Sequence, residues 1–117
     1  MNDWGTRRDR KLELIASGSI LADGLEQVVI ELDLPHPTTI SGWISLVNEA
    51  GGDTLAVKEY VKINAAGPIQ HSQDTYLGPV ALPALQTGPT TARWYRLTIQ
   101  QTAGVNRNYG YEIYKEV

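Results

Sequence analysis

Alternation of apolar and polar residues with a period of two is the feature that most constrains the fold of this chain. It runs through residues 54–63 and 93–101, and it resumes at Tyr109, Tyr111 and Ile113 after a turn-like stretch at 102–108. Successive side chains of a strand point to opposite faces, so this pattern is typical of an antiparallel sheet with one buried face. No stretch shows the three-and-four apolar spacing of an amphipathic helix over three turns. The sequence therefore predicts an all-β fold.

Strand candidates recur at regular spacing, each bounded by Gly, Pro, Asn or Asp. There are eight of them, at residues 11–20, 25–33, 39–47, 54–63, 69–77, 80–85, 91–101 and 108–116. Short strands with regular turn signals between them are typical of an all-β sandwich. We predict a single antiparallel β-sandwich of about eight strands, jelly-roll-like or immunoglobulin-like. We also expect its last two strands to pair with each other in the centre of one sheet.

The apolar faces of these strands define a predicted core. It contains Leu14, Val28, Ile30, Ile44, Val57, Val61, Leu97, Ile99, Tyr111 and Ile113. Glu59 falls on an apolar face in mid-strand, where an unpaired carboxylate is costly, so it needs a basic partner or a bulge that turns it outward. Alternation points Trp43 outward, whereas a core Trp is the more common outcome in sandwiches of this size. The placement of Trp43 stays open.

A chain of 117 residues is long enough for one core. We expect one domain at residues 12–117, preceded by a flexible charged arm at residues 1–11. The arm holds four basic and two acidic residues, a charge of +2, and the rest of the chain holds six basic and eleven acidic residues, a charge of −5. Cysteine is absent, which excludes disulfides and thiolate metal sites and fits a reducing compartment. We expect no transmembrane segment and no signal peptide.

The sequence shows no catalytic, cofactor or metal signature. His36 lies between two prolines, and strand alternation places Ser72 on the face opposite His71 and leaves Asp74 too far along the strand. Two histidines and no cysteine give no zinc spacing, and the loop at 48–53 lacks the alternating oxygen ligands of a calcium loop. Phosphate-binding glycine loops are also missing. We therefore predict no enzymatic activity, no cofactor and no metal site.

Outward aromatic and basic side chains mark a candidate interface instead. If Tyr95 and Leu97 face the core, the residues between and beside them face outward, and Tyr60 does the same between two lysines. Trp, Tyr and Arg are enriched at the energetic centres of interfaces. The acidic body argues against nucleic-acid binding except through the arm. We assign the candidate interface to Trp4, Arg7, Arg8, Arg10, Tyr60, Trp94 and Arg96.

Several turn and strand motifs resemble those of a known group of proteins. They are ASGS at 16–19, ADG at 22–24, EQ at 26–27, SGWISL at 41–46, GDT at 52–54, KEYVK at 58–62, LTIQQTAG at 97–104 and YGYE at 109–112. Together they resemble small, largely uncharacterised β-sandwich proteins of phage, prophage and archaeal virus structural gene clusters. The resemblance covers nearly the whole chain from about Leu12 onward. It brings no catalytic or binding residues with it.

The resemblance implies a virion structural protein: a capsid, decoration or related shell component assembled in the cytoplasm. Such a protein works by self-association, as a homo-oligomer such as a trimer, and can also bind another capsid protein. The first alternative is a carbohydrate-binding or adhesion module that stacks sugars on Trp94, Tyr60 and Trp43. The second is a small enzyme, which requires His71 to converge with carboxylates in a pocket.

Overall fold

The protein is all-β. A computed structural model describes residues 11–117, and these contain no helix. The six strands are β1 (Leu12–Leu21), β2 (Gln27–Ser45), β3 (Thr54–Val61), β4 (Ile69–Leu77), β5 (Ala84–Ala103) and β6 (Asn108–Glu116). They form one antiparallel sheet in the order β1-β6-β2-β5-β3-β4. No segment of residues 11–117 is a helix with the length and hydrophobicity needed to cross a membrane.

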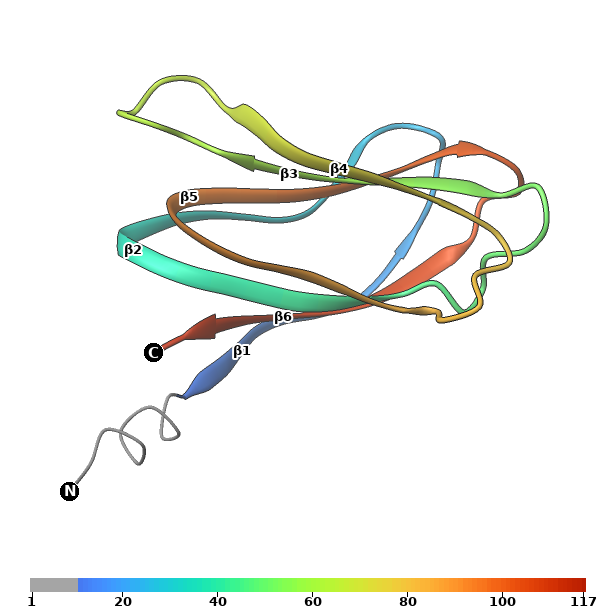
Figure 1. Cartoon of the computed structure of the whole chain (residues 1–117), viewed down its shortest axis with the longest axis horizontal. Helices are drawn as coiled ribbons and strands as arrows, with labels where there is room; N and C mark the ends of the chain where they lie inside the picture. The colour runs from blue at the N-terminus through green and yellow to red at the C-terminus, as the bar shows by residue number, and fades with distance from the viewer. Residues whose placement is uncertain (1–10) are drawn as a thin grey trace.

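Two long, bent strands fold this sheet into two facing layers. Residues 27–33 of β2 pair with 94–99 of β5, whereas residues 38–45 of β2 pair with 84–92 of β5 and also contact β6. Both strands turn back at the same end of the molecule, at the left of Figure 1. One half of the sheet, the β3 layer, contains β4, β3 and residues 94–103 and 27–33. The other half, the β6 layer, contains β1, β6 and residues 38–45 and 84–92.

The bends explain why residues 11–117 form six strands and not eight. The predicted strands at 25–33 and 39–47 are one strand, because Pro35 and Pro37 interrupt the ladder without ending the extended backbone. The predicted strand at 80–85 is mostly a turn, and only its last two residues begin β5. The expected pairing of the last two strands is wrong. The C-terminal half of β5 lies in the β3 layer and β6 lies in the other, with β2 between them in the sheet order.

The core lies between the two layers. Ile40, Ile44 and Ile113 of the β6 layer pack in one cluster with Leu55 and Leu97 of the β3 layer, and all are at most 1% exposed. Side chains interdigitating between facing sheets are the expected source of stability in such a fold. Five of the ten predicted core residues are buried: Ile44, Val57, Leu97, Ile99 and Ile113. Three more are partly buried: Ile30, Val61 and Tyr111.

The core prediction is wrong for the remaining two residues, Leu14 and Val28. They are 50% and 51% exposed. In each strand the pairing register shifts directly after the exposed residue, between Leu14 and Ala16 in β1 and between Val28 and Ile30 in β2. One extra residue reverses which positions face inward, so Ile15 and Val29 pack against the core instead.

Candidate functional site

The structure brings three of the predicted interface residues together on the outer face of the β3 layer. Tyr60 of β3 faces Arg96 of β5 in the ladder. The Arg96 guanidinium lies 5.4 Å from the centre of the Tyr60 ring and 4.9 Å from that of Trp94, and the Lys62 Nζ lies 4.6 Å from the Trp94 ring centre. These distances are those of cation–π contacts. We call Tyr60, Lys62, Trp94 and Arg96 the cation–aromatic cluster.

Trp94 is covered in this cluster, contrary to the expectation of an exposed ring. It lies on the outward row, as alternation predicts, but only 8% of its surface is exposed. Lys62 and Arg96 each place a cation over the ring. Long basic side chains commonly cover apolar surface in this way while their charged ends stay in water. Trp94 is therefore not available as a flat stacking platform.

Two glutamates balance the positive charge around the cluster. Glu26 accepts hydrogen bonds from the Thr98 hydroxyl at 2.6 Å and the Tyr60 hydroxyl at 2.5 Å, and it lies 3.7 Å from the Lys58 Nζ. The Thr98 hydrogen bond, followed by the one from Tyr60, lowers the pKa of Glu26. Glu31 pairs with the Arg96 Nε at 2.9 Å. These partners could not be predicted from the sequence, because both glutamates lie on other parts of the chain.

A polar cleft lies on the open side of the folded sheet, between β4 and the first part of β5. Its volume is about 230 Å³, and Glu59, His71, Ser72 and Asp74 contribute to its lining. Alternation predicted that Ser72 and His71 lie on opposite faces, but both reach this cleft. Ser72 pairs with Glu59 whereas Gln70 pairs with the next residue of β3, so His71 is the extra residue of a bulge. Bulges commonly redirect a side chain in this way.

Glu59 faces inward, and hydroxyl groups donate to it, so neither expected solution, a basic partner or a bulge that turns it outward, is found among residues 11–117. Its Oε2 accepts hydrogen bonds from Tyr95 at 2.6 Å and from Thr90 at 3.0 Å, and its Oε1 accepts one from Ser72 at 3.1 Å. Burial, followed by this hydrogen bond, raises the pKa of Tyr95. No cation among residues 11–117 forms an ion pair with Glu59.

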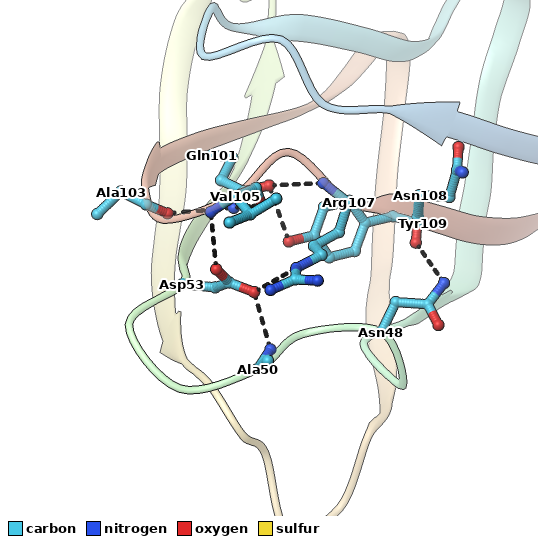
Figure 2. Close-up of polar contacts among 9 residues, drawn as sticks. All are labelled: Asn48, Ala50, Asp53, Gln101, Ala103, Val105, Arg107, Asn108 and Tyr109. Atoms are coloured by element: carbon cyan, nitrogen blue, oxygen red, sulfur yellow. Dashed lines mark hydrogen bonds and ion pairs between the residues drawn. The ribbon is translucent and has the colours of Figure 1, made fainter.

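Another carboxylate, that of Asp53, is buried at the end of the molecule where two loops meet (Figure 2). It accepts hydrogen bonds from the backbone N–H groups of Ala50 and Val105 at 2.8 and 3.0 Å and from the Arg107 Nε at 2.8 Å. These contacts, led by the Ala50 N–H, lower the pKa of Asp53. A Cβ on Gly104 would lie 2.1 Å from the Asp53 Oδ1, so only glycine fits there.

Gln101 completes this end of the structure. Its amide donates to the carbonyl groups of Ala103 and Val105, and its Oε1 accepts from the Arg107 N–H and the Tyr109 hydroxyl. Glu49 lies beside this network, 4% exposed, and neither of its oxygens has a partner among the described residues. Burial, together with the charge of Asp53, raises the pKa of Glu49 to about 7.

The remaining candidates are separate from these sites. Trp43, left open by the sequence, is 45% exposed on the outer face of the β6 layer. The arm residues of the predicted interface, Trp4, Arg7, Arg8 and Arg10, lie outside the described residues. Within residues 11–117, no three His, Asp or Glu side chains gather closely enough to hold a metal ion. Comparison with known proteins finds no matching family model, no matching curated protein and no matching solved structure.

Proposed function

We propose that this protein is a non-catalytic structural component of a virion shell, of the capsid or decoration type, and that it works by self-association. The jelly-roll-like or immunoglobulin-like character of its two-layered sheet belongs to the same proposal. The observation that supports it best is the open edge of β1. Within residues 11–117 this strand is hydrogen-bonded only to β6, so among these residues its other side has no strand partner along ten residues.

The side chains of β1 leave this edge attractive to another strand. Leu12, Leu14 and Leu21 are 58%, 50% and 60% exposed. Edge strands that avoid association usually carry lysine, proline or a bulge; β1 carries neither lysine nor proline, and its one register shift lies between Leu14 and Ala16. Pairing with an open edge of a second copy would satisfy the backbone groups and bury leucine surface at the same time.

The charge distribution favours a second copy as the partner. The arm that directly precedes β1 has a charge of +2, and the remainder of the chain has a charge of −5. The basic arm of one copy is therefore complementary to the acidic body of the next. A contact between two different edges closes into a ring, such as a trimer, when its rotation allows.

Light scattering coupled to size exclusion tests this proposal over a range of concentrations. We expect a defined oligomer for the full chain and weaker association both for Leu14→Lys and for a version starting at Lys11. Leu82→Lys is the matched control, because Leu82 is 84% exposed and lies outside every strand. A full chain that stays monomeric throughout contradicts the proposal, as does a Leu14→Lys variant that associates like Leu82→Lys.

Glycan binding is the second candidate function, and the surroundings of Trp43 are the observation that favours it. Trp43 faces Glu112 across β2 and β6, the Tyr114 hydroxyl donates to Glu112 at 2.8 Å, and an apolar hollow of about 200 Å³ adjoins the Trp43 ring. An exposed ring beside a carboxylate suits a sugar, which stacks its apolar face and donates its hydroxyls. Saccharide affinity that Trp43→Ala abolishes and Tyr60→Phe preserves would favour this candidate.

A further inference from the structure

The polar cleft between β4 and β5 has the chemistry of a binding site, and no function discussed so far uses it. It contains two carboxylates, Glu59 and Asp74, on the same inward row of neighbouring strands, since Glu59 pairs with Ser72 and Val57 with Asp74. No lysine or arginine of residues 11–117 lines it, and neither carboxylate forms an ion pair with these residues. Negative charge in a partly desolvated cleft strongly favours a cationic guest.

Counting acceptor positions shows that Glu59 has room for one more donor. A carboxylate has about four acceptor positions, two on each oxygen. Two hydroxyls donate to Oε2, from Tyr95 and Thr90, but only Ser72 donates to Oε1. One position on Oε1 therefore remains unfilled among the described residues, and the three donors already hold the group in a fixed orientation.

Thr87 provides an independent sign that a ligand belongs here. It lines the same cleft from the β5 side, is only 5% exposed, and its Oγ1 is buried with no hydrogen-bond partner among the described residues. Leaving a buried hydroxyl unpaired costs free energy, so most such groups in folded proteins have a partner. A donor that enters the cleft from outside would supply that partner.

The walls of the cleft indicate the shape of the guest. Leu85, Pro89 and Tyr76 add apolar surface beside the carboxylates and hydroxyls. A cavity of about 150 Å³ is known to hold a benzene-sized molecule, so a cleft of about 230 Å³ accommodates a short alkyl chain with a planar head group. A metal ion fits poorly, because no three His, Asp or Glu side chains of residues 11–117 converge.

From this geometry we infer that the cleft between β4 and β5 binds an alkyl guanidinium or alkyl ammonium group. The cationic head lies between Glu59 and Asp74, donates to the free position on the Glu59 Oε1 and reaches the Thr87 Oγ1. The alkyl chain lies against Leu85 and Pro89. This chemistry is found in free amines and in arginine or lysine side chains, including those of residues 1–11 of another copy. The inference does not rest on the proposed self-association.

Two shape-matched probes test it by ¹H–¹⁵N NMR on the full chain. We expect butylguanidinium to produce saturable shifts of the amides of Glu59, Ser72 and Thr87. Butylurea, which has the same shape without the charge, should leave these amides unshifted. Amides around Trp43 on the opposite layer serve as the internal reference. Equal shifts with both probes, or no shifts with either, would overturn the inference.

Variants separate binding from folding. Asp74 lies at the exposed rim of the cleft. Asp74→Asn should weaken butylguanidinium binding roughly tenfold or more, because the guest loses a charged hydrogen-bond partner. The control is Glu31→Gln, which removes an exposed carboxylate outside the cleft and should leave the affinity unchanged. Thr87→Val, which keeps the shape of the side chain, should weaken binding by a smaller factor. Unchanged affinity in both Asp74→Asn and Thr87→Val contradicts the inference.

A peptide with the sequence of residues 1–11 distinguishes the sources of the cation. If it produces the same shifts and competes with butylguanidinium, the inference is supported and the occupant is the arm of another copy. Saturable butylguanidinium binding without peptide binding also supports the inference and points to a free amine or to another protein. The oligomeric state is measured separately, so failure of the cleft and failure of self-association give different results.

Discussion

Asp53 and Glu59 are carboxylates only six residues apart, yet the fold surrounds them in opposite ways. Asp53 receives two backbone N–H groups and a guanidinium, and it is 1% exposed. Glu59 accepts hydrogen bonds from three hydroxyl groups, has no cationic partner within residues 11–117 and faces a cleft. A carboxylate with a cationic partner and backbone donors stabilises the fold, whereas one with spare acceptor capacity beside a cavity is available to a ligand. The two carboxylates therefore differ in how many of their acceptor positions the described residues fill.

Removing Asp53 should produce the largest effect. Asp53→Ala leaves the N–H groups of Ala50 and Val105 without their acceptor and Arg107 without its counter-ion. We expect a fall in Tm on the order of 10 °C or more, because buried donors without acceptors are costly. Asp23→Ala is the matched control, since Asp23 is exposed and accepts one hydrogen bond, from the Leu25 N–H. Equal Tm changes in the two variants, measured by circular dichroism, would show that Asp53 does not hold the loops.

The alternation of apolar residues predicted part of the fold and failed where a strand contains a bulge. Alternation was sufficient to predict an all-β, antiparallel fold and the inward positions of Leu97, Ile99 and Ile113. It could not indicate which residue of a pair of adjacent apolar positions, such as Leu14 and Ile15, faces inward. One bulge reverses the pattern, and apolar residues stand at both positions. The β4 bulge misled the interpretation of His71 in the same way.

Contacts between distant segments were also beyond the reach of the pattern. The outward direction of Trp94 follows from alternation, but its cover depends on Lys62 of the segment after β3. Likewise, the two prolines around His36 correctly mark a break in the ladder. They could not show that the strand continues into the other layer, because that continuation is set by pairing with β5. Such information belongs to the tertiary structure alone.

Glu59 should have an intermediate effect on stability. Glu59→Gln keeps one acceptor oxygen but removes the charge that strengthens the hydrogen bonds of Tyr95 and Thr90. We expect a loss of about 1–3 kcal/mol in the free energy of unfolding by urea. Tyr95→Phe should cost a similar amount, and the double variant should cost less than the sum because the two groups share one bond. Additive losses would mean that the Tyr95–Glu59 contact contributes little.

Glu49 extends the comparison to a carboxylate that lies beside the hydrogen bonds of Asp53 and Gln101 but has no donor among the described residues. Its pKa is raised from 4.5 to about 7. The folded protein therefore holds this proton more tightly than the unfolded chain, and stability falls as the pH rises from about 4.5 to about 7. Glu49→Gln should remove this fall and raise the Tm by a few degrees above pH 7. A Tm profile with the same slope in both proteins between these pH values would contradict the assignment.

The smallest effect is expected in the cation–aromatic cluster, where every charge has a partner but water screens the contacts. Lys62→Ala removes one of the two cations that lie over the Trp94 ring and leaves the Arg96 guanidinium in place. We expect a loss of about 0.5–1 kcal/mol, typical of an exposed cation–π contact, together with a shift of the Trp94 indole N–H resonance. Lys58→Ala, whose side chain contacts Glu26 and not the ring, should leave that resonance in place. If Lys62→Ala instead costs as much as Glu59→Gln, the cover over Trp94 is a structural element comparable to the interior hydrogen bonds. Contacts on the outer face of the β3 layer would then stabilise the fold as strongly as the hydrogen bonds of Glu59.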